Sequence, residues 1–176
     1  MNLANKITLF RLCLIPVFPL VFFSSLENRL TLALIVFLIA GISDVLDGYI
    51  ARNYNMITPL GTVLDPLADK LMVLTVVSCF VYTDLLPLWL LLLYLVKEGI
   101  QIIIGTFFYF NKYKIQIPSN KFGKFGTAFL YALIIGVGLD IPNPIQKILL
   151  FISLMLALLA FVSYGKALIF EVKEER

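Results

Sequence analysis

Histidine is absent from this sequence, and charged residues account for only 14% of its 176 positions. The absence of histidine removes the most common general base and the most common zinc ligand. Any acid–base chemistry therefore depends on Asp, Glu, Lys, Tyr or water. The two cysteines, Cys13 and Cys79, lie in apolar runs. That setting is typical of small buried hydrophobic residues and argues against a disulfide or a metal pair.

Hydrophobic residues are abundant instead and make up 61% of the chain. A soluble domain is about half apolar and about a quarter charged, so this composition indicates an integral membrane protein. We expect one membrane domain over residues 1–176, with an uncleaved first helix and no separate soluble domain. The formal net charge of +3 is too small to predict a nucleic-acid partner.

Six apolar segments approach or exceed the length of about 20 residues that a membrane helix needs. Short polar loops separate them. We expect an all-α integral membrane protein with six transmembrane helices around a polar cleft open to the cytoplasmic side. Thr58 is predicted to cap the third helix, with Pro59 at its first position. The expected helices cover Ile7–Phe23, Leu30–Ala51, Leu60–Tyr82, Leu86–Phe110, Lys121–Gly138 and Pro144–Phe170.

Basic residues gather after the second, fourth and sixth expected helices. Because positive residues favour the cytoplasm, we expect both termini on the cytoplasmic side of a multi-pass protein of the bacterial cell membrane. The residues that set this orientation are Arg52, Lys112, Lys114, Lys121, Lys124, Lys166, Lys173 and Arg176.

Four aspartates interrupt the apolar pattern in the stretch SDVLDGYIARNYNMITPLGTVLDPLADK. Asp44 and Asp47 are three residues apart, and Asp65 and Asp69 are four apart, so each pair lies on one helix face. Four carboxylates in one apolar cleft repel each other and lose hydration, so either several are protonated or cations hold them. Oxygen ligands favour Mg²⁺, Mn²⁺ or Ca²⁺, and two such ions about 3.5–4 Å apart suit phosphoryl transfer.

Two other interpretations fit the acid count alone. Intramembrane acids often mark the ion path of a small cation transporter. Alternatively, each acid is a packing element paired with a cation, drawn from Arg11, Arg52, Lys70 or Lys97. Neither interpretation explains why small residues and an arginine stand at fixed offsets from the acids.

Those offsets match a known pattern. The sequence D-x2-D-G-x2-A-R-x8-G-x3-D-x3-D is filled without a gap, and it resembles the signature of the CDP-alcohol phosphatidyltransferases. The resemblance extends to the length of the chain and the six helices. It implies an enzyme of phospholipid biosynthesis that displaces CMP from CDP-diacylglycerol with an alcohol. The matching residues are Asp44, Asp47, Gly48, Ala51, Arg52, Gly61, Asp65 and Asp69.

The resemblance also implies roles for these residues. All four aspartates would hold two divalent ions, Mg²⁺ or Mn²⁺, and Asp69 would also take the proton from the attacking hydroxyl. The CDP-lipid would bind at Asp44 and at four neighbouring positions of the signature. Relatives pair through their membrane helices, which implies a homodimer surrounded by membrane lipids. The four neighbouring positions are Gly48, Ala51, Arg52 and Gly61.

The acceptor alcohol is indicated by the opening NLANKITLFRLCLIPVF, which looks like the start of family members that use glycerol 3-phosphate. Members that use phosphatidylglycerol start similarly, so both acceptors stay open. An acceptor phosphate would bind Lys97, Lys121 and Lys124, although Gly105 stands where relatives usually carry a further arginine. The alternative for Lys97 is an ion pair with Glu98 or an aspartate. A catalytically silent scaffold in a lipid-synthesis complex is the third hypothesis for the chain.

Overall fold

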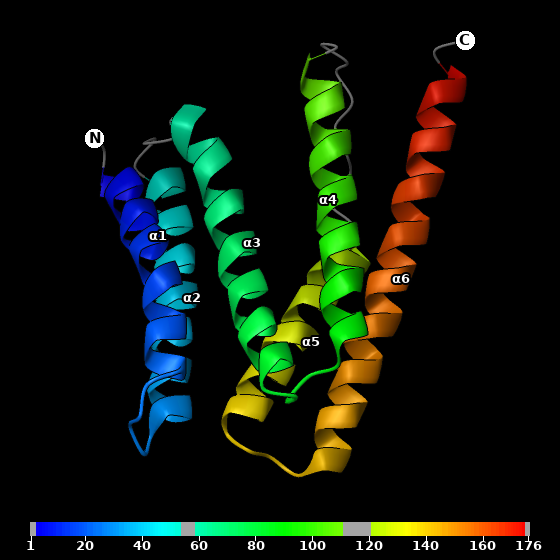
Figure 1. Cartoon of the computed structure of the whole chain (residues 1–176). Coiled ribbons are helices and arrows are strands. Elements are labelled where there is room, and N and C mark those ends of the chain that lie inside the picture. The colour runs from blue at the N-terminus through cyan, green and yellow to red at the C-terminus, as the bar shows by residue number, and fades with distance from the viewer. Residues whose placement is uncertain (1–2, 54–58, 111–120, 175–176) are drawn as a thin grey trace. The chain divides into compact units, whose positions relative to one another are not determined.

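The six expected helices are present in the computed structural model (Figure 1). It describes residues 3–53, 59–110 and 121–174, and side chains for residues 7–50, 53, 64–65, 67–100 and 122–163. No strand occurs in those ranges, so the all-α prediction is confirmed. The helices are α1 (Leu3–Phe22), α2 (Arg29–Asn53), α3 (Pro59–Tyr82), α4 (Leu88–Phe110), α5 (Lys121–Gly138) and α6 (Asn143–Glu174).

The helix boundaries differ from prediction mainly at the two ends of the chain. Helix α1 begins four residues before the apolar run, at Leu3, and α6 continues to Glu174 instead of ending at Phe170. Pro59 is the first residue of α3, as predicted, because a missing N–H costs nothing in the first turn. The predicted cap, Thr58, lies outside the described residues.

The chain forms two compact units, residues 1–91 and residues 92–176. In the first unit α1 packs against both α2 and α3, which makes it the central helix of the three. In the second unit α5 packs against α6 along its length (Figure 1). The prediction of a single membrane domain stays a prediction.

The core of the first unit contains aromatic side chains at one end and small side chains at the contact between α1 and α2. Phe22 stacks on Phe18 with ring centroids 5.8 Å apart and contacts Phe80 of α3 at 5.5 Å. Ala33 and Ala40, seven residues apart on α2, are completely buried. Small residues allow helices in a membrane to approach closely, so this stripe brings α2 against α1.

The contact between α5 and α6 also uses a small residue. A Cβ added at Gly126 would lie 3.4 Å from the Cβ of Leu156, so the backbone of α5 runs close to α6 there. Leu130, Leu133 and Ile134 continue the buried face of α5. Dispersion and close packing, not exclusion of water, hold such a pair together in lipid.

Helices α3 and α5 end in the same way. Asp84 and Asp140 adopt left-handed backbone conformations, with φ of 57° and 51°. The amide of Leu85 donates to the carbonyl of Phe80 at 2.8 Å, and that of Ile141 donates to Gly136 at 3.0 Å. These six-to-one bonds define Schellman motifs, in which aspartate takes the place usually held by glycine.

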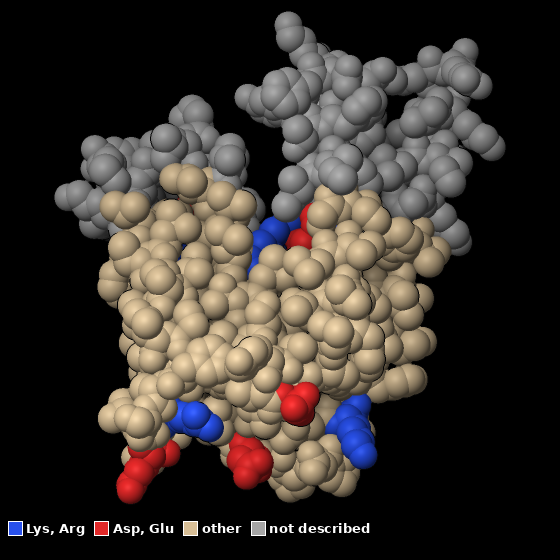
Figure 2. Space-filling view, in the orientation of Figure 1, with Lys and Arg blue, Asp and Glu red and all other residues tan. Residues whose placement is uncertain are grey.

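Many large hydrophobic side chains of both units are exposed among the described residues. Figure 2 shows a face on which uncharged side chains dominate among the described residues. Two segments, Arg29–Ile50 and Asn143–Ser163, are long and apolar enough to cross a membrane, and only 28% and 17% of them is buried inside the protein. A core helix of a soluble protein would be mostly buried, so these helices present their apolar sides outward.

Candidate active site

A buried arginine on α1 faces the two aspartates of α2. Arg11 is 1% exposed, and its guanidinium forms ion pairs with both carboxylates. Nη1 donates to Oδ1 of Asp44, and Nη2 donates to Oδ2 of Asp47 at 2.9 Å. Nη1 also lies 3.5 Å from the backbone carbonyl of Asp65 on α3. One side chain of α1 therefore reaches both acid-bearing helices.

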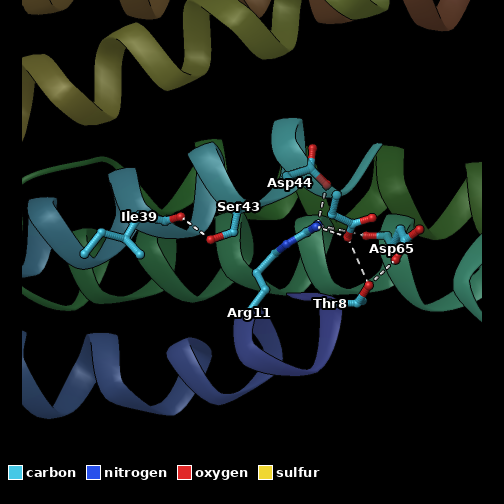
Figure 3. A network of polar contacts seen from close by, with 7 residues as sticks. Thr8, Arg11, Ile39, Ser43, Asp44 and Asp65 are labelled. Atoms are coloured by element: carbon cyan, nitrogen blue, oxygen red, sulfur yellow. Dashed lines mark hydrogen bonds and ion pairs between the residues drawn. The ribbon is translucent and has the colours of Figure 1, made fainter. Parts of the chain in front are cut away.

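A threonine one turn earlier makes the second connection. The hydroxyl of Thr8 lies 3.0 Å from Oδ2 of Asp47 and 2.6 Å from Oδ1 of Asp65. Figure 3 shows Thr8 and Arg11 pointing from α1 toward Asp44 and Asp65. We call the five residues Thr8, Arg11, Asp44, Asp47 and Asp65 the acid cluster. It joins all three helices of the first unit.

Helical spacing explains how these residues meet. Thr8 and Arg11 are three residues apart on α1, and Asp44 and Asp47 are three apart on α2, so each pair shares a helix face. Ser43 is also buried, but its hydroxyl donates to the carbonyl of Ile39 in the preceding turn at 2.7 Å. The hydroxyl of Ser43 therefore bonds within α2 and does not contribute to the acid cluster.

The acid cluster carries more negative than positive charge. Three carboxylates face one guanidinium, which leaves two negative charges if all the groups are ionised. Oδ1 of Asp47 is buried and has no hydrogen-bond partner among the described residues. A buried carboxylate oxygen without a partner costs free energy and calls for an additional ligand.

A divalent cation is the ligand that this donor chemistry fits best, because the free donor is a carboxylate oxygen and the excess charge is negative. Within the described part of the chain, however, no three acidic side chains are arranged to hold one ion together. The guanidinium of Arg11 and the hydroxyl of Thr8 lie among them instead. The residues fit a cation in donor type and charge, while the arrangement seen is held by protein groups alone.

The fourth predicted ligand, Asp69, lies on α3 one turn after Asp65 and is partly buried. Gly48 follows Asp47 on α2 and is also partly buried. The remaining predicted positions for the CDP-lipid fall outside the residues whose side chains the structure describes. These positions are Ala51, Arg52 and Gly61.

The predicted acceptor lysines belong to the second unit. Lys97 is 9% exposed, forms an ion pair with Glu98 at 3.0 Å and lies 5.1 Å from the centre of the Tyr94 ring. The ion pair with Glu98 is the alternative that the sequence left open for Lys97. Lys124 is exposed on α5, whereas the side chain of Lys121 is outside the described residues.

The sequence does not predict Thr8 as a site residue. It offers Arg11 as a possible packing partner of the acids, and the structure shows that pairing for Asp44 and Asp47. A signal for both was available, because an arginine and a threonine three residues apart in an apolar helix form a polar face that needs a partner.

Comparison with known proteins shows the family to which the chain belongs. The sequence model of the CDP-alcohol phosphatidyltransferases matches residues 1–159, which include the whole acid cluster. The chain belongs to the CDP-alcohol phosphatidyltransferase family. It is therefore a phosphatidyltransferase and a membrane protein, and the alternatives of a cation transporter and a silent scaffold are set aside.

Several relatives match almost the whole chain. A Rickettsia typhi protein named CDP-diacylglycerol-glycerol-3-phosphate 3-phosphatidyltransferase is 32% identical over 173 residues, which cover 94% of this chain and 96% of the relative. An Aquifex aeolicus protein of the same name is 34% identical over 175 residues, with 93% and 94% covered. A Streptomyces coelicolor cardiolipin synthase (CMP-forming) is 42% identical over 72 residues, or 41% of this chain and 34% of its own.

Proposed function

We propose that this phosphatidyltransferase is a phosphatidylglycerophosphate synthase. It transfers the phosphatidyl group of CDP-diacylglycerol to glycerol 3-phosphate and releases CMP. The observation that carries the proposal is the acid cluster, which gathers three aspartates of the family signature from α2 and α3 around one polar face of α1. The choice of acceptor is supported by the names of relatives that match the chain over nearly its full length.

In the proposed reaction a hydroxyl oxygen of glycerol 3-phosphate attacks the phosphorus that carries diacylglycerol. The bond from that phosphorus to the oxygen of CMP breaks, and CMP leaves with the electron pair. Asp69 takes the proton of the attacking hydroxyl. A carboxylate is a weak base for an alcohol, but it suffices when the proton moves as the new phosphorus–oxygen bond forms.

The four aspartates would hold two divalent ions, Mg²⁺ or Mn²⁺, which supply positive charge to the pyrophosphate and to the leaving CMP. Support for this comes from the excess of negative charge in the acid cluster and from the unpartnered Oδ1 of Asp47. Asp44 and the positions Gly48, Ala51, Arg52 and Gly61 bind the CDP-lipid. The small residues leave room for the cytidine, and Arg52 contacts a phosphate or an acid.

The acceptor phosphate carries two negative charges near neutral pH, so its binding requires positive charge from the protein. Lys97, Lys121 and Lys124 supply the compensating positive charge. In the structure Lys97 forms an ion pair with Glu98. To bind the phosphate, Lys97 would have to break this ion pair or bond to both groups at once. Lys124 is exposed and can bind an anion without breaking an ion pair that the structure records.

The membrane placement follows from the substrate. A CDP-lipid keeps its acyl chains in the bilayer, and its head group needs a polar cleft at the cytoplasmic surface. Six membrane-crossing helices with both termini in the cytoplasm meet this requirement and agree with the distribution of lysine and arginine. A homodimer stays a prediction from the resemblance.

Cardiolipin synthase activity is the second candidate, because the Streptomyces coelicolor relative of that name is 42% identical over 72 residues. In that case phosphatidylglycerol is the acceptor. Its phosphate carries one charge and stays at the lipid surface, so the lysines of the second unit matter less.

One assay tests the proposed function against this candidate. Purified protein in mixed micelles receives CDP-diacylglycerol with Mg²⁺ and, in separate reactions, glycerol 3-phosphate, phosphatidylglycerol, serine or inositol phosphate. Lipid mass spectrometry identifies the product. We expect phosphatidylglycerophosphate from glycerol 3-phosphate only. Cardiolipin from phosphatidylglycerol, with glycerol 3-phosphate unreactive, would replace the proposal with the second candidate.

A further inference from the structure

Thr8 and Arg11 are among the most buried polar residues of the described chain, each 1% exposed, in a helix whose other residues from Ile7 onward are apolar. A buried arginine is costly in a membrane protein and is retained where it serves a function. The family signature lies on α2 and α3 and includes no residue of α1. The chemistry proposed above also assigns nothing to this helix.

Thr8 and Arg11 bond to one carboxylate oxygen of each of three aspartates. Arg11 and Thr8 occupy Oδ1 of Asp44, Oδ2 of Asp47 and Oδ1 of Asp65. The second oxygen of Asp47, Oδ1, is buried and has no hydrogen-bond partner among the residues that the structure describes. Each carboxylate is thus held through one oxygen, and Asp47 keeps a buried oxygen for a further ligand.

We propose that Thr8 and Arg11 are positioning residues for phosphatidyl transfer. From α1 they fix the orientation of Asp44, Asp47 and Asp65, so that one oxygen of each is presented to the divalent ions and the CDP-lipid. The inference rests on the proposed function, because it assumes that these aspartates are the reacting site. Outer groups that orient metal ligands typically matter about 10–100-fold for metal affinity or activity.

The residue types suit this role. Arginine presents two terminal nitrogens in a rigid planar fork, so a single side chain can bond two carboxylates at once. Lysine has the same charge but one nitrogen, which cannot reproduce that fork. The hydroxyl of Thr8 is within hydrogen-bonding distance of both Asp47 and Asp65, so this one side chain reaches carboxylates on two helices.

The first test replaces the forked guanidinium of Arg11 with the single amino group of lysine and keeps the positive charge. Arg11→Lys is compared with Arg29→Lys, a control at an exposed arginine at the start of α2. Two quantities are measured on folded protein: steady-state kcat and KM for glycerol 3-phosphate, and Mn²⁺ binding in the absence of lipid substrate, by electron paramagnetic resonance. We expect Arg11→Lys to lower kcat and to weaken Mn²⁺ binding, each about 10–100-fold, with KM changed less than about threefold. The control is expected to match the wild type.

The second test removes a hydroxyl without changing charge or shape, and it covers the case in which Arg11→Lys does not fold. Thr8→Val is compared with Thr8→Ser and with Thr75→Val, whose hydroxyl bonds only to the carbonyl of Leu71 in its own helix. We expect Thr8→Val to lower kcat and weaken Mn²⁺ binding at least about tenfold. Thr8→Ser should restore most of the loss, and Thr75→Val should behave as the wild type.

The outcomes separate this inference from the proposed function. Wild-type kcat and Mn²⁺ binding in both Arg11→Lys and Thr8→Val would overturn the positioning role. Tighter Mn²⁺ binding by Arg11→Lys would also overturn it, because it would mean that the guanidinium competes with the ion. If the wild type makes no lipid from glycerol 3-phosphate, the proposed function fails, while the Mn²⁺ measurements still decide whether the pair orients the aspartates.

Discussion

The guanidinium of Arg11 bonds Asp44 through one terminal nitrogen and Asp47 through the other, the second contact measuring 2.9 Å. This relationship ties α1 to the two acids that open the family signature. It also explains how acids can stand in an apolar helix: part of their charge is balanced inside the protein. The acid cluster keeps an excess of negative charge that Arg11 does not balance.

Divalent-cation dependence is the first prediction. Thorough chelation should abolish CMP release from CDP-diacylglycerol, and Mg²⁺ or Mn²⁺ should restore it, because the acid cluster has an excess of negative charge and the pyrophosphate adds more. CMP is quantified by chromatography before and after metal is returned. Full activity in the chelated enzyme would contradict the assignment of the aspartates as metal ligands.

The proton acceptor is tested by Asp69→Asn. Asparagine still offers a carbonyl oxygen but cannot take the hydroxyl proton, so kcat should fall about 10²–10⁴-fold while the CDP-lipid still binds. Binding is measured by equilibrium titration with a fluorescent CDP-lipid, and turnover by CMP release. Asp44→Asn serves as the matched comparison and should weaken binding as well. Substantial turnover by Asp69→Asn would contradict the assignment of Asp69 as the general base.

Much of the fold was predictable because long apolar runs separated by polar loops leave few alternatives to helices. All six helices were predicted, and the limits of α5 agree with the expected range. The start of α1 and the end of α6 were missed because helical hydrogen bonding continues beyond the expected apolar run at each of these boundaries. Helix length follows backbone bonding as well as hydropathy.

The aspartates of the site were predictable from their spacing, but their partners were not. Spacing shows which residues share a face of one helix, whereas the pairing of Thr8 with Asp47 and Asp65 depends on how α1 packs against two other helices. That packing is set by residues such as Ala33, Ala40 and Phe22, whose contacts cannot be read from one sequence. The contacts between the polar face of α1 and the aspartates could therefore be identified only from the structure.

The acceptor site is tested by removing charge from α5. Lys124→Gln should raise KM for glycerol 3-phosphate about tenfold or more, since a charge-assisted bond to phosphate is lost, and should change KM for CDP-diacylglycerol little. Lys147→Gln, at another exposed lysine, is the control and should have the kinetics of the wild type. An unchanged KM in Lys124→Gln would exclude Lys124 from acceptor binding.

Lys97→Gln is a less direct test of the acceptor site, because it also breaks the buried ion pair with Glu98. It should therefore lower thermal stability in addition to any effect on KM, since the other charge is left buried. The melting temperature is measured in detergent alongside Lys124→Gln, which changes an exposed residue and should melt with the wild type.

The end of α5 offers a test of the fold that is independent of the chemistry. A Cβ at Gly136 would lie 2.5 Å from Cδ1 of Ile141, the residue that closes the Schellman motif. Gly136→Ala should leave the protein less stable than Gly41→Ala, because the side chain of Ile141 must shift to make room for the new methyl group. Gly41→Ala is the control, since nothing lies within 4 Å of its added Cβ. Equal melting temperatures for the two variants would contradict the close packing of this turn.

We propose that the aspartates of the acid cluster carry out phosphatidyl transfer to glycerol 3-phosphate. The most direct measurement is glycerol 3-phosphate-dependent CMP release by purified wild-type protein beside Asp47→Asn, with folding of both checked by thermal melting. We expect the wild type to release one CMP for each phosphatidylglycerophosphate formed. We expect at least about a hundredfold less CMP from the variant, which loses the charge of the most buried acid of the cluster. CMP release at the wild-type rate by folded Asp47→Asn would contradict this proposal.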